Sequence, residues 1–187
     1  MIEIPREMIL RAQEGDEAAG RALVEALQRP VIGTIYRLLG PARPRDVEAI
    51  AEQVFLAMFR ALPRFDDSCS SFTAWVYAFV RDHCSGLPDT HMASPASYQV
   101  DGDEGAHFEL QHHQDVERAE LGRRVVEALA TLGEEQRTVF VLREYERLGY
   151  REIAAITGVH EGTVKSRLAR AKASMRRQLQ PYLETYA

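Results

Sequence analysis

Cysteine and long apolar runs are both scarce in this chain of 187 residues. The two cysteines, Cys69 and Cys84, are too few for the disulfide framework of a small secreted domain, and we take both as reduced thiols. No apolar run approaches the roughly 20 residues that cross a bilayer, and the N-terminal segment lacks the apolar core of a signal peptide. We therefore expect a cytoplasmic protein without membrane insertion.

Motifs that carry catalytic chemistry are absent as well. The sequence contains no HExxH helix, no glycine-rich phosphate loop and no pair of carboxylates at a fixed helical spacing. Most of the histidines gather in one stretch around Cys84, which contains His83, His91, His107, His112 and His113. Their spacing matches no compact zinc or copper motif. We expect no enzyme activity, no cofactor and no metal site. A metal-dependent enzyme built on these histidines is the rival interpretation.

The pattern of apolar residues predicts an all-α protein. Apolar residues make up 45% of the chain, recur every three or four positions, and nowhere alternate as in a half-buried strand. Asp16 and Asp46 are the predicted N-cap residues of two helices. Pro30 is expected to bend or interrupt the second helix, and Pro63 to end the third. The predicted helices are 5–14, 19–39, 46–62, 72–80, 115–131, 134–145, 150–157 and a last one from about 160 to 179.

Charge is distributed unevenly along the chain. Residues 1–81 carry ten basic and eleven acidic side chains, residues 82–122 carry one and nine, and residues 150–187 carry seven and three. The local field, rather than the net charge of −5, decides whether a phosphate backbone is attracted. We predict two small helical domains, 1–86 and 117–187, joined by a flexible acidic linker, 87–116, that contains most of the histidines.

The most informative stretch begins at Tyr150. Apolar residues predict a helix that ends at Thr157, and Gly158 can adopt the left-handed backbone that ends helices. In the helix that follows, Val164 and Leu168 lie on one side and most arginines and lysines on the other. Two helices joined by a tight turn, the second with a basic face, are typical of a helix-turn-helix that reads the DNA major groove. A solvated basic surface is the alternative.

The residues of this stretch resemble those of a known protein family. The string GTVKSRL at 162–168, following YREIA at 150–154, closely resembles the C-terminal domain of extracytoplasmic-function (ECF) sigma factors. These are the small two-domain members of the bacterial sigma-70 family. The resemblance implies that the second helix recognises the −35 promoter element. The residues that it assigns to DNA are Glu161, Thr163, Lys165, Ser166, Arg167 and Arg170. We expect Arg167→Ala to weaken promoter binding.

The front half resembles the N-terminal domain of the same family. The matching strings are DVE at 46–48, RAL at 60–62, RFD at 64–66 and FTAWVY at 72–77. The resemblance implies that Asp46, Glu48 and Gln53 dock on core RNA polymerase, and that a loop captures a flipped base of the −10 element. A flipped base needs stacking partners and hydrogen bonds, and the residues assigned to it are Phe65, Ser68, Ser70, Ser71, Phe72 and Trp75. Filling of the bundle core is the alternative for most of the aromatic residues.

Two features depart from the family pattern. Asp82 stands where the family has an asparagine, and Gly86 and Pro88 are expected to stop the helix before the usual basic residues. The alternative function is therefore a helix-turn-helix transcriptional regulator with a sigma-like partner-binding domain that lacks promoter-melting activity. The resemblance implies three partners, which are core polymerase, double-stranded promoter DNA and an anti-sigma factor. The acidic linker would either imitate nucleic acid in the polymerase channel or act as a tether.

Overall fold

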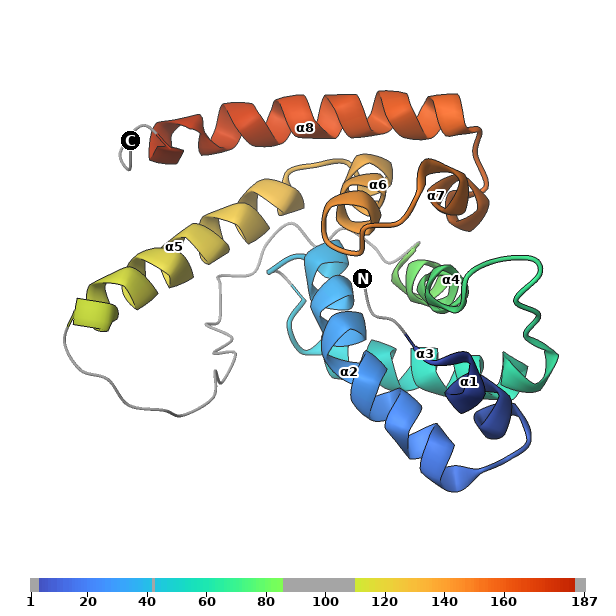
Figure 1. The fold of residues 1–187 in the computed structure, drawn as a ribbon. Coiled ribbons are helices and arrows are strands. Elements are labelled where there is room, and N and C mark those ends of the chain that lie inside the picture. Colours follow the sequence, from blue (N-terminus) through green and yellow to red (C-terminus); the bar gives the residue numbers. More distant parts are fainter. Residues whose placement is uncertain (1–3, 42, 86–109, 184–187) are drawn as a thin grey trace.

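The structure, a computed structural model, describes residues 4–41, 43–85 and 110–183. These residues form α-helices, one short 3-10 turn and no strand (Figure 1), which confirms the predicted all-α class. No helix in the described ranges is long and apolar enough to cross a membrane. The elements are α1 Arg6–Gln13, α2 Glu17–Leu39, α3 Asp46–Ala61, the 3-10 turn η1 Leu62–Arg64, α4 Phe72–Cys84, α5 Leu110–Ala130, α6 Glu134–Glu144, α7 Tyr150–Thr157 and α8 Glu161–Leu183.

The front half is a bundle in which α2 packs against α1, α3 and α4. The apolar residues from which α2 was predicted lie in the core of this bundle. Among them, Leu23, Leu27, Val31 and Ile35 are almost completely buried. Pro30 does not interrupt α2, which is one continuous helix. Proline removes one backbone hydrogen bond, but buried residues on both sides of Pro30 hold the helix against its neighbours, and this tertiary packing outweighs the local cost.

The two predicted N-caps had different outcomes. The Asp16 carboxylate accepts hydrogen bonds from the backbone N–H groups of Ala18 and Ala19 at 2.8 and 3.2 Å, as an N-cap does. The prediction for Asp46 was wrong, because Arg45 is the N-cap and Asp46 lies in the first turn of α3. The Asp46 carboxylate instead pairs with Arg43 Nε at 2.6 Å.

Three helix ends also differ from the sequence-based expectation. Helix α4 continues to Cys84, four residues beyond the expected end at Val80, and Ser85 follows it as the C-cap. Helix α3 stops at Ala61, and the predicted stop residue Pro63 lies within η1. Helix α5 begins at Leu110, inside the segment predicted to be the linker. The rest of that segment, which includes Pro88, lies outside the described residues, as does Gly86 before it.

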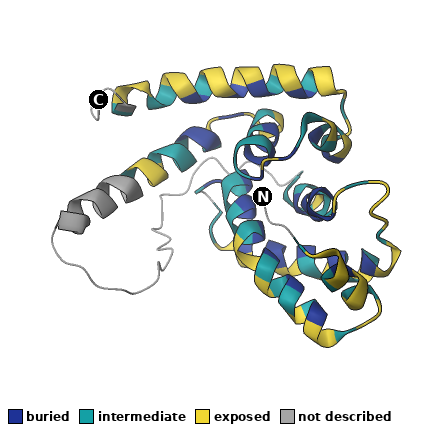
Figure 2. Cartoon of the chain, in the orientation of Figure 1, coloured by how far each residue is buried: buried dark blue, intermediate teal, exposed yellow. Residues whose placement is uncertain are grey.

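The C-terminal half consists of α5 to α8. Helix α8 lies across α5, α6 and α7 (Figure 1) and packs against all three. Its buried side chains face them, and its exposed side faces away (Figure 2). The two halves are in direct contact, because α2 packs against α5 and α6, and α4 packs against α7.

Candidate nucleic-acid interface

Local hydrogen bonds fix the helix-turn-helix formed by α7 and α8. The Glu152 side chain accepts from the backbone N–H of Gly149 at 2.8 Å and thereby caps the start of α7. Gly158 ends α7 with a φ of 69°, the left-handed conformation that the sequence predicted. The backbone N–H of Val159 then donates to the carbonyl of Ala154 at 3.2 Å. The chain therefore turns within three residues and enters α8 at Glu161.

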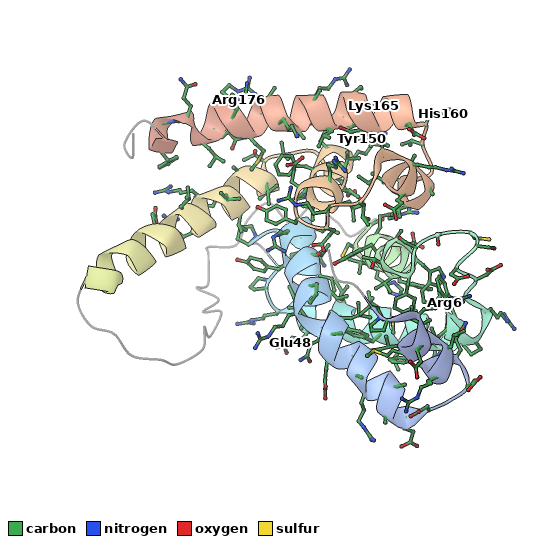
Figure 3. All side chains as sticks on the ribbon, in the orientation of Figure 1. Arg6, Glu48, Tyr150, His160, Lys165 and Arg176 are labelled. Carbon is green, nitrogen blue, oxygen red and sulfur yellow. The ribbon has the colours of Figure 1, made fainter. Side chains whose placement is uncertain are left out.

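Helix α8 separates an apolar side from a basic side. Its core residues Val164, Leu168, Ala171 and Met175 are at most 5% exposed. The opposite face holds only exposed side chains, and basic residues alternate there with small ones. We call this face the basic stripe of α8, made of Lys165, Ser166, Ala169, Arg170, Ala173, Arg176 and Arg177. Figure 3 labels Lys165 and Arg176 near its two ends.

The six predicted −35 residues do not all lie on this stripe. Lys165, Ser166 and Arg170 do, and Glu161 is exposed at the start of α8. Thr163 is half-buried at the stripe's N-terminal edge. Arg167 lies on the flank, where its side chain is 18% exposed and pairs with Glu135 of α6 at 2.5 Å. Arg176 and Arg177 were expected on the basic face but not among the −35 residues, and both are exposed on the same face of α8.

The loop between η1 and α4 gathers most of the predicted −10 residues. Phe65 belongs to an aromatic cluster centred on Trp75, with ring centroids 5.2 Å from Phe72 and 4.9 Å from Trp75. Phe72 is only 7% exposed and therefore belongs to the core, as the alternative interpretation expected. Phe65 and Trp75 are half-buried and keep an edge at the surface.

A hollow of about 300 Å³ opens beside this loop. Its volume is at the lower end of the range for small-molecule sites. Helix α1 forms the wall opposite Phe65, and this wall was not predicted, because no local pattern links α1 to a loop some 50 residues later. The hollow is lined by Ile4, Arg6, Ile9, Leu10, Gln13, Phe65, Asp66, Asp67 and Phe72.

Helix α1 also fixes the conformation of the loop. The Gln13 side-chain amide donates to the carbonyls of Leu62 and Phe65 at 3.0 and 2.9 Å. Arg6 Nε pairs with Asp67 Oδ2 at 2.6 Å across the hollow's rim, and Figure 3 labels Arg6 at this end of the molecule. These contacts attach the start of the loop, at Leu62 and Phe65, and its middle, at Asp67, to α1.

The three serines predicted to donate to a base lie in different surroundings. Ser68 is exposed, and its backbone N–H donates to Asp66 Oδ1 at 2.9 Å, so the loop tip is an Asx turn. This bond and one from the Ser68 side chain lower the pKa of Asp66. Ser70 is half-buried. Ser71 caps α4, and its hydroxyl also donates to Glu152 of α7 at 2.5 Å.

The outer face of α3 carries two of the three predicted docking residues. Glu48 and Gln53 are exposed there, whereas Asp46 is half-buried at the edge of that face. Leu56 lies on the same side and is 49% exposed, the largest exposed fraction among the big apolar side chains of the described residues. Single exposed apolar side chains are common on protein surfaces, so the assignment of this face to docking rests on the family resemblance. Figure 3 labels Glu48 on α3.

The two cysteines lie at opposite ends of α4. Cys69 is exposed in the preceding loop, and Cys84 is the last residue of the helix. A helix of 13 residues is about 20 Å long, whereas the Cα atoms of a disulfide are at most about 7 Å apart. The two thiols therefore do not form an intrachain redox switch in this fold. Burial raises the pKa of the Cys84 thiol to about 12.

The histidine cluster lies largely outside the described side chains. His83 is the one member within them, and its ring nitrogen Nδ1 is hydrogen-bonded to the carbonyl of Phe79 at 2.8 Å. Within the part of the chain that the structure describes, no group of three or more His, Cys, Asp or Glu side chains could hold a metal ion.

Comparison with known proteins gives a family to each half of the chain. Residues 23–85 match the family described as Sigma-70 region 2, and residues 122–175 match the one described as Sigma-70, region 4. The RNA polymerase sigma-H factor of Pseudomonas aeruginosa is 30% identical over 97% of this chain and 96% of its own length. The ECF RNA polymerase sigma-E factor of Escherichia coli is 29% identical over 94% of each chain.

Solved structures show the same fold. CnrH, determined in complex with the cytosolic domain of CnrY, aligns with a TM-score of 0.67 and 23% identity over 94% of this chain and 97% of its own. The sigma factor RpoE, determined with the anti-sigma factor NepR from Bartonella quintana, aligns with a TM-score of 0.63 and 17% identity over 86% and 96%. The family matches and the sequence relatives favour a sigma factor over a regulator that lacks promoter-melting activity. The chain therefore belongs to the sigma-70 family, as an RNA polymerase sigma factor of the ECF group.

Proposed function

We propose that this sigma factor, which directs promoter-specific transcription initiation, uses three separate surfaces for the task. The basic stripe of α8 binds the −35 element, the hollow between α1 and the Phe65–Ser71 loop receives a −10 base, and the outer face of α3 docks on core polymerase. The observation that carries the proposal is the basic stripe, because it is exposed over its whole length on the second helix of a helix-turn-helix.

The stripe divides into a base-reading part and a phosphate-binding part. In helix-turn-helix proteins, the N-terminal residues of the second helix approach the base edges. Thr163, Lys165 and Ser166 occupy that position, followed by Arg170, Arg176 and Arg177 along the next turns. The small side chains of Ala169 and Ala173 allow the helix to lie close to the groove. We assign base reading to the first three and phosphate binding to the three arginines.

Arg167 supports this surface from the side. Its ion pair with Glu135 joins α8 to α6 at 2.5 Å, so it orients α8 relative to the rest of the domain. Arg167→Ala is therefore expected to weaken promoter binding by loosening this contact, and not by removing a phosphate contact. Glu161, at the start of α8, favours the helix N-terminus electrostatically and completes the predicted −35 set.

The hollow beside α1 has the chemistry that a flipped base needs. Phe65 offers an aromatic ring, while Asp66 and Asp67 offer acceptors at the rim. A base extruded from the duplex loses its stacking, and aromatic side chains restore about 1–3 kcal/mol per base. Carboxylate acceptors favour a base edge that carries an amino group. Phe65, Ser68, Ser70 and Trp75 keep their proposed −10 role, whereas Ser71 and Phe72 support the loop as a cap and as core.

The end of α4 differs from the family pattern without opposing this role. The Asp82 carboxylate pairs with Arg81 at 3.0 Å, so its charge is partly compensated before any phosphate approaches. We therefore propose that promoter melting relies on the loop more than on the end of α4.

The remaining predicted partners belong to the same proposal. The exposed Leu56, with Glu48 and Gln53, forms a docking surface for core polymerase on α3. An anti-sigma factor is a further proposed partner, supported by the complex with the anti-sigma factor NepR in which the similar RpoE was determined. The proposed site of action is the cytoplasm, the role is binding rather than catalysis, and the proposed domains are 1–86 and 117–187.

Run-off transcription with bacterial core polymerase tests the proposal. Genomic promoter fragments are transcribed with the wild-type chain, with Phe65→Ala and with Lys165→Ala. We expect Phe65→Ala to bind promoter DNA within the holoenzyme but to initiate poorly on double-stranded templates, and to recover on templates with a pre-melted −10 region. Lys165→Ala should lose binding to fragments with an intact −35 element. The assignment would be contradicted if Phe65→Ala stayed inactive on the pre-melted template. It would also be contradicted if both variants were as active as the wild-type chain.

A further inference from the structure

The ring of Tyr150 contacts basic side chains from two other helices. Tyr150 is the first residue of α7 and is half-buried. The Arg143 guanidinium of α6 lies 4.9 Å from the centre of the ring, and Lys165 Nζ of α8 lies 5.6 Å from it. Both distances are within the roughly 6 Å of a cation–π contact. Figure 3 labels Tyr150 and Lys165 close together. One ring therefore links α6, α7 and α8 where Lys165 begins the basic stripe.

The turn that leads into α7 fixes the position of this ring. Arg143 Nη1 donates to the Leu148 carbonyl at 2.8 Å, and Leu148 is only 1% exposed. The backbone N–H of Gly149 donates to the Glu152 side chain at 2.8 Å. Tyr150 therefore follows a segment that is anchored both to α6 and to the first turn of its own helix.

Lys165 differs in this contact from the other basic residues of the stripe. Within the part of the chain that the structure describes, Arg170, Arg176 and Arg177 have no hydrogen bond, ion pair or aromatic contact. Lysine has a flexible four-carbon side chain, so an exposed lysine adopts many rotamers, few of which point its ammonium group at a given base. A ring that holds the side chain before DNA arrives lowers the cost of ordering it. The ammonium group carries three N–H donors and can contact the ring and a base together.

Three roles for Tyr150 make different demands on its side chain. Packing alone requires an apolar side chain of similar size, which leucine provides. A direct hydrogen bond to a DNA phosphate requires the hydroxyl, which phenylalanine lacks. Orientation of a cation requires the negative face of an aromatic ring, which phenylalanine provides and leucine does not. The three roles can therefore be separated by substitution.

We propose that Tyr150 is a positioning residue for promoter recognition, whose ring orients Lys165 toward one base pair of the −35 element. Arg143 supports the ring from α6 and takes no part in the contact with the base. The strength of preference for that base pair then depends on Tyr150, although Tyr150 itself does not touch it. This role rests on the base reading proposed above for Lys165.

Fluorescence anisotropy of labelled promoter fragments, titrated with holoenzyme, tests the proposal. One fragment has the intact −35 element, and each of the others has one base pair of that element changed. The preference at a base pair is the ratio of the Kd for the changed fragment to the Kd for the intact one. Lys165→Ala is measured first, because the base pair at which it removes the preference is the one that Lys165 reads.

Tyr150→Leu, Tyr150→Phe and the double variant Tyr150→Leu with Lys165→Ala are then compared. Tyr150→Leu should lower both the affinity for the intact fragment and the preference at this base pair about two- to fivefold, the effect of an exposed cation–π contact. It should leave the preference at the other base pairs unchanged. Tyr150→Phe should bind as the wild-type chain does. In the Lys165→Ala background, Tyr150→Leu should have no further effect, because the ring acts only through Lys165.

Two further variants separate positioning from damage to the domain. Tyr182→Leu is the matched control, because it removes a ring that lies 4.9 Å from the Arg124 guanidinium, and it should keep every preference. Pentafluorophenylalanine at position 150 keeps the shape of phenylalanine but reverses the charge distribution of the ring face, so it should lower the preference even if Tyr150→Leu does not fold. Circular dichroism of each variant reports whether the helices are intact.

The failure of the base-reading role and the failure of the positioning role give different results. If Lys165→Ala removes no preference, Lys165 does not read a base, and both roles are refuted. If Lys165→Ala removes a preference, three results each refute positioning alone. These are an unchanged preference in a helical Tyr150→Leu or pentafluorophenylalanine variant, a loss in Tyr150→Phe, and an equal effect of Tyr150→Leu with and without Lys165.

Discussion

The replacement of Arg170 by glutamine tests how α8 binds DNA. Arg170 is exposed on the basic stripe, and no hydrogen bond or ion pair ties its side chain to another described residue. The stripe from Lys165 to Arg177 is about 18 Å long at 1.5 Å per residue, which matches about five base pairs of duplex. Its three arginines can therefore meet successive phosphates along one groove.

The size of the effect follows from counterion release. Each phosphate contact contributes about −0.9 to the slope of log affinity against log salt concentration, so the three arginines together contribute about −2.7. Arg170→Gln should reduce this share to about −1.8. Over a fourfold change in salt, from 50 to 200 mM, the ratio of wild-type to variant affinity should then fall about 3.5-fold.

The assay is fluorescence anisotropy of a labelled promoter fragment titrated with holoenzyme at several salt concentrations. Arg167→Gln is the matched control, because it removes the same charge from α8 at a position that pairs with Glu135. We expect the control to lower affinity without changing the slope. An unchanged slope for Arg170→Gln, or an equal change for both variants, would refute the assignment of phosphate binding to the stripe.

Three further predictions concern docking, acid stability and thiol reactivity. Leu56→Glu should abolish binding to core polymerase in a pull-down and leave the melting temperature unchanged. The control is Leu10→Glu, which changes an exposed leucine on α1 instead of α3 and should still bind. Asp16→Ala should lower the melting temperature at neutral pH. Hydrogen bonds from Arg11 and Ala19 hold the pKa of Asp16 below 3.8. The stability that the Asp16 carboxylate adds is therefore present above that pH and is lost as the pH falls through the lowered pKa. A difference in melting temperature between wild type and Asp16→Ala that persists at pH 2 would contradict this. Iodoacetamide at pH 8 should modify Cys69 and spare Cys84 until the chain is denatured, as read by mass spectrometry, because burial raises the pKa of Cys84.

Features set by neighbouring residues could be predicted from the sequence. The cap at Asp16, the left-handed Gly158 and the two sides of α8 all depend on residues within one or two helical turns. The family strings added the sigma-factor function, which the comparisons confirm. The site residues remain predictions, although most of them lie on exposed surfaces.

Errors in the predicted elements arose where a distant or competing contact decided the outcome. Arg43 draws the Asp46 carboxylate away from a capping position. Packing on both sides carries α2 through Pro30. Helix α4 extends past Val80, and Arg81 in that extension bonds to α7. The packing around Pro30 and the bond from Arg81 to α7 involve distant residues that a local window does not contain, whereas Arg43 lies only three residues from Asp46 and offers a second partner that competes with the cap.

The sequence by itself determined the helical class, the helix-turn-helix and the basic face of α8, because helical period, caps and glycine turns act over a few residues. Only the tertiary structure decided that α1 forms one wall of the hollow beside Phe65, that Arg167 pairs with Glu135, and that Glu146 joins the two halves. These contacts link residues that are 32 to 112 positions apart in the chain. They form because the packed helices bring distant residues side by side, and at the buried Glu146 those neighbours are the partners that replace water.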